Sequence, residues 1–160
     1  MLYVVAWPLL GEADDTALRR LRAQYHPREA DLIGPHFTLV FGAPVEREAA
    51  LREALVAIDR RPFWFLIDRI ARHDLHLYAE PSDGAAELTQ LYETLNPAPG
   101  GEPFEPHITL GLFGHASQAE QVARIVERQH LPIHGRVEEL ALLKRAGDGL
   151  ETVATIRLGA

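Results

Sequence analysis

Cysteine is absent from this 160-residue sequence, which excludes disulfide bonds, thiolate nucleophiles and cysteine-ligated metal or iron–sulfur centres. The absence also leads us to expect a cytoplasmic protein. No run of about 18 apolar residues occurs, so no membrane span is predicted. Residues 1–8 have neither a basic region nor a small-residue cleavage site, and we expect them to form a first strand rather than a signal peptide.

Positive charge is also scarce: 16 Lys and Arg stand against 23 Asp and Glu, giving a net charge of −7. A protein that binds a long nucleic-acid duplex neutralises many phosphates with Lys and Arg. We therefore expect no such partner, whereas a small or terminal phosphate requires only a few local positive groups. The length and the 47% apolar content fit one soluble domain, and we expect a monomer.

Short elements separated by proline and glycine follow one another along the chain. Residue alternation predicts strands at residues 2–7, 36–41, 63–71, 75–79, 107–113, 137–143 and 152–158. Helices are predicted up to residue 25, where Pro27 follows, over residues 46–59 and 83–95, and from residue 117. Their expected caps are Asp14 or Asp15, Asp83, and a Ser117–Glu120 capping box. The order of elements in the first half recurs in the second, which indicates an internally duplicated α+β unit.

The sequence Pro-His-x-Thr-Leu occurs twice, at residues 35–39 and 106–110, with the two histidines 71 residues apart. One such match is weak evidence, but two with the same flanks are far rarer. Because side chains alternate along a strand, His36 and Thr38 share one face, as do His107 and Thr109. The other faces are predicted to pack on helices; they carry Phe37, Leu39 and Phe41 in the first copy, and Ile108, Leu110 and Leu112 in the second. The two polar faces are then expected to meet across a cleft.

Two histidines and two threonines in one cleft suit phosphodiester chemistry. In-line displacement at phosphorus needs a base on the attacking oxygen and an acid on the leaving oxygen, and histidine titrates near neutral pH. Threonine hydroxyls can donate hydrogen bonds to the non-bridging oxygens. The other six histidines are expected at the surface or at helix ends. They form no His-x-x-x-His pair on a helix, so no metal site is predicted.

Five further residues are candidate substrate contacts. Lys144 and Arg145 end a predicted strand and carry positive charge that attracts an anionic substrate. Tyr3, Trp7 and Phe113 offer rings on which a base can stack. The alternative interpretations are solvated strand-end charges for the first two residues and core packing for the three aromatic side chains.

The paired motifs, the duplicated lobes and the length resemble the two-histidine (2H) phosphoesterase superfamily. This superfamily includes bacterial RNA 2′,3′-cyclic phosphodiesterases, also called 2′-5′ RNA ligases. The resemblance implies one bilobal α+β domain over residues 1–160, with a motif in each lobe. It also implies two antiparallel sheets that face each other across a central cleft, with helices on their outer faces.

The same resemblance implies hydrolysis of cyclic phosphodiesters on nucleotides or RNA ends, without a metal or other cofactor. His36 and His107 would be catalytic, and Thr38 and Thr109 would bind phosphate. A 2′-5′ RNA ligase and a non-catalytic nucleotide- or phosphate-binding module are the alternative functions.

Overall fold

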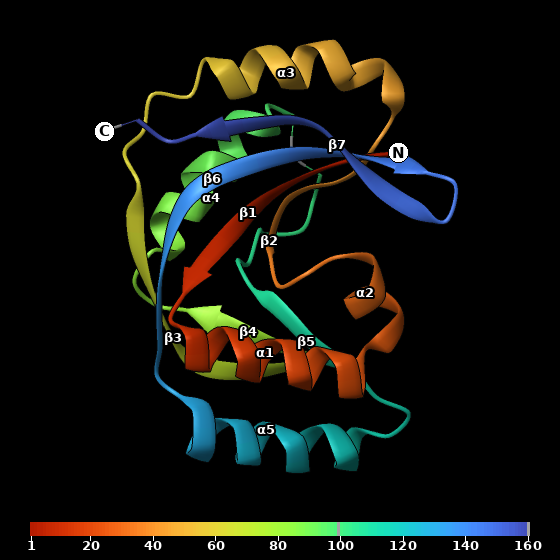
Figure 1. Ribbon diagram of the computed structural model, residues 1–160, viewed down its shortest axis with the longest axis vertical. Coiled ribbons are helices and arrows are strands. Elements are labelled where there is room, and N and C mark those ends of the chain that lie inside the picture. The colour runs from red at the N-terminus through yellow and green to blue at the C-terminus, as the bar shows by residue number, and fades with distance from the viewer. Residues whose placement is uncertain (99, 160) are drawn as a thin grey trace.

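The strands of the computed structural model, which describes residues 1–98 and 100–159, belong to one antiparallel sheet. They are β1 (Leu2–Leu10), β2 (Phe37–Ala43), β3 (Phe63–His73), β4 (His76–Pro81), β5 (Ile108–Leu112), β6 (Ile133–Ala146) and β7 (Gly149–Arg157). Their order is β1-β2-β5-β4-β3-β6-β7, and β1 also pairs with β6, so that the strands from β1 to β6 close into a ring. Figure 1 shows β1 and β6 side by side as the long strands of this curved sheet.

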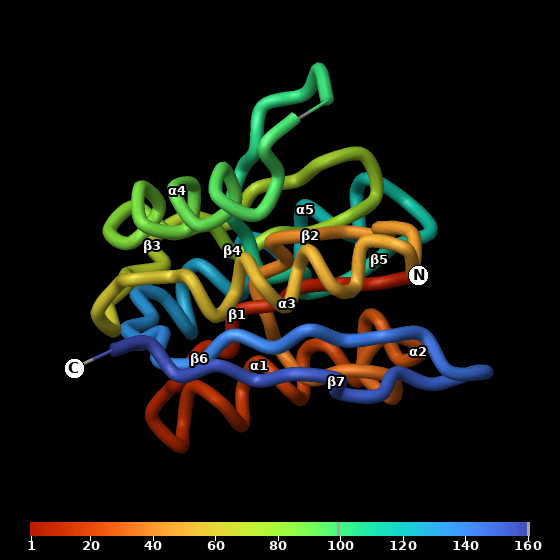
Figure 2. The backbone as a smooth tube through the Cα atoms, turned by 90° about the horizontal axis from the view of Figure 1, so that it is seen from above, coloured from red at the N-terminus to blue at the C-terminus, as the bar shows by residue number. Residues whose placement is uncertain are grey.

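Helices cover the two ends of the sheet. They are α1 (Glu12–Tyr25), α2 (Pro27–Leu32), α3 (Glu48–Val56, preceded by the 3-10 turn Val45–Arg47), α4 (Ala85–Leu95) and α5 (Ala116–His130). Helix α1 packs on β5 and α5 on β3, whereas α4 packs on β2, and Figure 1 shows α1 and α5 at the end opposite α3. Figure 2 shows the described residues between α4 and β5, 96–98 and 100–107, projecting from the rest of the molecule. No helix in the described parts of the chain has the length and apolarity to cross a membrane.

This arrangement confirms the α+β class and agrees with the predicted duplication. Hydrogen bonds join the two halves, because β1 pairs with β6 and β2 pairs with β5. The two expected sheets are therefore two parts of one continuous sheet.

The residue after each motif threonine is a β-bulge. On β2, Thr38 pairs with Val5 and Val40 with Val4, so Leu39 is extra. On β5, Thr109 pairs with Tyr78 and Gly111 with Leu77, so Leu110 is extra. A bulge shifts the alternation of side chains by one residue.

The bulges correct the predicted face of two side chains. Phe41 and Leu112, each three residues after a motif threonine, were expected to pack on helices. They are instead turned to the face that carries the threonines, where they are 80% and 46% exposed. The duplication thus extends to the irregularities of the two strands.

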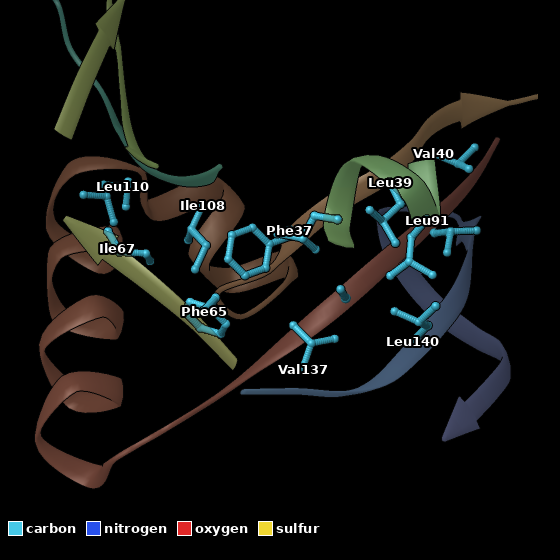
Figure 3. Packing of buried hydrophobic residues seen from close by; sticks show 14 of the residues in the cluster. Phe37, Leu39, Val40, Phe65, Ile67, Leu91, Ile108, Leu110, Val137 and Leu140 are labelled. Atoms are coloured by element: carbon cyan, nitrogen blue, oxygen red, sulfur yellow. The ribbon is translucent and has the colours of Figure 1, made fainter. Parts of the chain in front are cut away.

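The core lies on the other face of the sheet. Phe37 is fully buried and meets Phe65 edge to face, with ring centroids 5.1 Å apart. Figure 3 shows these two rings near Ile108, with Leu39 of β2 and Leu91 of α4 further along the same core. The residue after each motif histidine, Phe37 or Ile108, therefore anchors its strand in the core.

The predicted helix caps are wrong. Helix α1 is preceded by Gly11, and Asp14 and Asp15 lie in its first turn, where their charge favours the helix dipole. Gly84, with a φ of +88°, precedes α4 in place of Asp83. His115 precedes α5 without a side-chain cap bond, so Ser117 is inside the helix and forms no capping box. Pro27 ends α1 as expected, but it also begins the unforeseen α2.

Phe37→Ala is expected to lower the free energy of unfolding by about 3–5 kcal/mol, because it opens a cavity beneath the β2 motif. Phe41→Ala, on the same strand but 80% exposed, is the matched control and should change it by less than about 0.5 kcal/mol. Urea unfolding of both variants measures the difference. Equal losses would contradict the assignment of the two faces.

Candidate active site

One residue pair places the two motifs side by side. Strands β2 and β5 are antiparallel and are paired at Phe37 and Ile108. Extending this register by one residue in each direction sets His36 beside Thr109 and Thr38 beside His107. The two histidines are then diagonal neighbours, whose Cα atoms are typically about 7–8 Å apart. The charge of His107 lowers the pKa of His36, as expected for diagonal neighbours on paired strands.

Each histidine is oriented by the same backbone contact. The Nδ1–H of His36 donates to the carbonyl of Gly34 at 2.8 Å, and the Nδ1–H of His107 donates to the carbonyl of Glu105 at 2.8 Å. Because a carbonyl only accepts, Nδ1 carries the proton in both neutral rings, and Nε2 is left with a lone pair. Both rings can therefore accept a proton through Nε2, or donate one from Nε2 once protonated.

The pKa values of both histidines lie below the ordinary value for this side chain. Burial is the largest cause for His36, and the charges of Arg22 and His107 lower its pKa further, against the Gly34 bond and Glu29. Burial also lowers the pKa of His107, opposed by its bond to Glu105 and by nearby carboxylates, including those of Glu80 and Glu29. The protonated form is thus less disfavoured by surrounding charges at His107 than at His36.

Two adjoining hollows form the cleft, and both are lined by Glu29, Thr38 and Phe41. The larger one, here called the His107 hollow, has a volume of about 610 Å³ and includes His107 and Thr109. The smaller one, the His36 hollow, has a volume of about 220 Å³; its lining includes His36, Tyr3, Val5, Ile33 and Arg145. The motif residues therefore line one continuous concave surface.

Tyr78 of β4 stacks on His107, with ring centroids 3.7 Å apart and planes 17° apart. His73 and His76 stack on Tyr78 in turn, at 6.0 Å and 5.9 Å. All three side chains line the His107 hollow, and burial raises the pKa of the Tyr78 phenol. Sequence analysis assigned the two histidines to the surface and did not identify Tyr78, because the pairing of β4 with β5 cannot be read from either segment alone.

Arg22 of α1 ties the segments that carry the two motifs. This residue is 1% exposed. Nε donates to the carbonyl of Thr109 at 3.1 Å, and Nη1 donates to the carbonyl of Ile33 at 2.8 Å. Arg22 was not predicted as a site residue. Its position could have indicated one, because Arg22 interrupts the apolar stripe of Leu18, Leu21 and Tyr25 on a helix whose apolar face is buried.

The five predicted substrate contacts do not all lie at the cleft. Tyr3 and Arg145 line the His36 hollow, and Trp7 meets His36 edge to face with ring centroids 6.4 Å apart. Two predictions are wrong. Phe113 is 5% exposed and packs against Tyr25 in the core. Lys144 points to the opposite face of β6 from Arg145, where Nζ pairs with Glu48 at 3.2 Å.

Over residues 1–98 and 100–159, no three or more histidine and carboxylate side chains are arranged to hold a metal ion.

Comparison with protein families gives a match over most of the chain. The family described as the 2'-5' RNA ligase superfamily matches residues 10–149. Among curated proteins, none matches the sequence significantly.

Solved structures share the fold over nearly the whole length. The crystal structure of E. coli LigT with 3'-AMP has a TM-score of 0.67 at 20% identity, covering 99% of this chain and 98% of LigT. A crystal structure described as a phosphoesterase has a TM-score of 0.65 at 19% identity, covering 99% and 98%. Kluyveromyces marxianus Usb1 has a TM-score of 0.55 at 11% identity, covering 95% and 96%. At these identities the likeness shows a common fold.

NMR titration of the imidazole rings should give midpoints for His36 and His107 below about 6.5, the ordinary histidine value. Because folding lowers these two pKa values, the unfolded state binds more protons below that pH. Their contribution to stability is therefore complete above about pH 6.5 and is lost as the pH falls. Between pH 7 and pH 5, the free energy of unfolding should fall less in a double variant, His36→Gln with His107→Gln, than in wild type. Midpoints at or above 6.5 would contradict the burial argument.

Proposed function

The chain belongs to the 2'-5' RNA ligase superfamily, and we propose that it is a metal-independent phosphoesterase that hydrolyses cyclic phosphodiesters. Nucleotide 2′,3′-cyclic phosphates and RNA ends that carry this group are the proposed substrates. The observation that carries the proposal is the pairing of β2 with β5. It supports a cleft in which two imidazoles, each with Nδ1 bound to backbone, present Nε2 to one phosphorus atom.

The proposed reaction needs one neutral and one protonated imidazole. One of His36 and His107 takes a proton from water through Nε2 as the water oxygen forms a bond to phosphorus. The other donates its Nε2 proton to the ribose oxygen as the bond between that oxygen and phosphorus breaks. The products are a phosphomonoester and a free ribose hydroxyl, and the two histidines exchange protonation states.

Thr38 and Thr109 are the proposed donors to the non-bridging phosphate oxygens. The register sets each threonine beside the histidine of the other motif. A phosphate between the histidines is therefore within reach of a hydroxyl from each strand. Both side chains are β-branched and stiff, which limits the entropy lost when they bind the phosphate.

Phe41 is the proposed surface on which the nucleobase stacks. It is 80% exposed, lines both hollows, and meets Tyr3 edge to face at 5.5 Å. A volume of about 610 Å³ is in the usual range for small-ligand sites. The fold relative LigT has been crystallised with 3'-AMP, ATP and NADP+, which supports a ligand of nucleotide size.

The proposed setting is a cytoplasmic monomer that acts as one bilobal domain, with one motif in each half. A 2′-5′ RNA ligase is the second candidate, since the matched family bears that description and ligation would use the same four residues. Product analysis separates the two, because the ligase joins RNA ends and the hydrolase releases a phosphomonoester.

His36→Ala and His107→Ala are each expected to lower kcat for nucleoside 2′,3′-cyclic phosphate by about 10²-fold to 10⁴-fold in the presence of EDTA. The wild-type pH–rate profile should be bell-shaped. His130→Ala is the control, because His130 ends α5 and lines a separate groove beside α1. Full activity in either motif variant, or loss of wild-type activity in EDTA, would contradict the proposal.

Phe41→Ala should raise KM for the same substrate by about tenfold, since stacking of one base on an aromatic ring contributes about 1–3 kcal/mol. Its kcat should change much less, because the ring does not reach the reacting atoms. Steady-state kinetics with a substrate that lacks the base, ribose 2,3-cyclic phosphate, supplies the comparison. An equal effect of the substitution on both substrates would rule out stacking.

A further inference from the structure

Glu29 of α2 occupies the centre of the concave surface. It lines the His107 hollow and the His36 hollow. It also lines a third hollow between α2 and the β6–β7 turn, together with Arg28, Asp31 and Arg145. Its side chain is 28% exposed, so part of the carboxylate faces the cleft and part is enclosed.

The Glu29 carboxylate lies against the side chains of His26 and Arg22. Its Oε2 lies 3.1 Å from Nε2 of His26 and 3.6 Å from Nη2 of Arg22. The guanidinium of Arg22 is in turn fixed by the carbonyls of Thr109 and Ile33. The Glu29 carboxylate thus lies against the buried guanidinium of Arg22 and presents its own negative charge to the cleft.

A carboxylate is an unexpected group in a cleft that is proposed to bind phosphate. We propose that Glu29 is a specificity-determining residue that makes the cleft favour phosphodiester monoanions over phosphomonoester dianions. This inference rests on the proposed function. It implies that the cleft holds the cyclic substrate in preference to its hydrolysis product, so that the product leaves readily.

The charges of the two ligands give the physical reason. A cyclic phosphodiester carries one negative charge, whereas a phosphomonoester carries about −1.5 to −2 at pH 7, because its second pKa is about 6. Repulsion by a carboxylate grows with the ligand charge and is screened little when the groups are partly buried. Glu102 and Glu105 also line the His107 hollow, but both are exposed, and water screens their charges.

Glu29→Gln is the discriminating variant, because it keeps the size of the side chain and removes the charge. Two inert probes are compared by calorimetry at pH 8: 2′-deoxyadenosine 3′-monophosphate, a dianion, and its 3′-methyl ester, a monoanion. The missing 2′-hydroxyl prevents cleavage of the ester. The variant should bind the monophosphate about tenfold more tightly than wild type, a gain of about 1.4 kcal/mol. Binding of the ester should change by less than about twofold.

Glu102→Gln is the matched control, with a carboxylate in the same hollow, and should leave both affinities within about twofold. Glu29→Asp keeps the charge and should retain the wild-type ratio of the two affinities. If Glu29→Gln does not fold, wild type alone still tests the proposal, because it should bind the ester at least as tightly as the more highly charged monophosphate.

An equal gain for both probes in Glu29→Gln, or a wild-type preference for the monophosphate, would overturn the charge selection. Neither result bears on hydrolysis, which is measured separately on the cyclic substrate. Conversely, a wild-type protein without hydrolytic activity would overturn the proposed function, while the binding comparison would remain readable.

Discussion

The pairing of Phe37 with Ile108 is the contact on which the site depends. Both side chains are buried in the core, and the antiparallel register between them fixes which residues flank the pair. Each motif histidine is thereby set beside the threonine of the other motif. Arg22 reinforces the arrangement from behind, because one guanidinium binds a carbonyl from each motif segment. A shift of one residue in this register would turn one motif into the core.

The duplication visible in sequence is expressed in structure at three levels. The two histidines bind the carbonyl two residues before them, the residues after them enter the core, and the residues after the threonines are bulges. The second level was predicted from alternation along a strand, whereas the histidine–carbonyl bonds were not predicted. The bulges were not predicted either, because alternation presumes an unbroken period of two, whereas a bulge depends on the partner strand. The exposure of Phe41, the proposed base-stacking surface, is a consequence of the bulge.

Long-range contacts account for the rest of what sequence could not predict. The strands were located correctly in outline because each is a local pattern. The helix caps at Asp14, Asp83 and Ser117 were misplaced: Gly11, Gly84 and His115 precede the helices instead, and of these only Gly84 has the positive φ that favours glycine. Lys144 and Arg145 are adjacent in sequence, yet only Arg145 faces the cleft, since neighbouring side chains on a strand point to opposite faces. Glu29 and Tyr78 could not be predicted as cleft residues, because their position depends on how α2 and β4 pack against the motif strands.

We propose that the two imidazoles act on one phosphorus atom from opposite sides. A crystal structure with a nucleoside 2′,3′-cyclic vanadate, whose metal adopts the five-coordinate geometry of in-line displacement, is the sharpest test of this arrangement. Nε2 of His36 and Nε2 of His107 are expected within about 2.6–3.2 Å of the two opposite axial oxygens. A vanadium centre bound outside the cleft, or contacted by both rings on the same side, would contradict it.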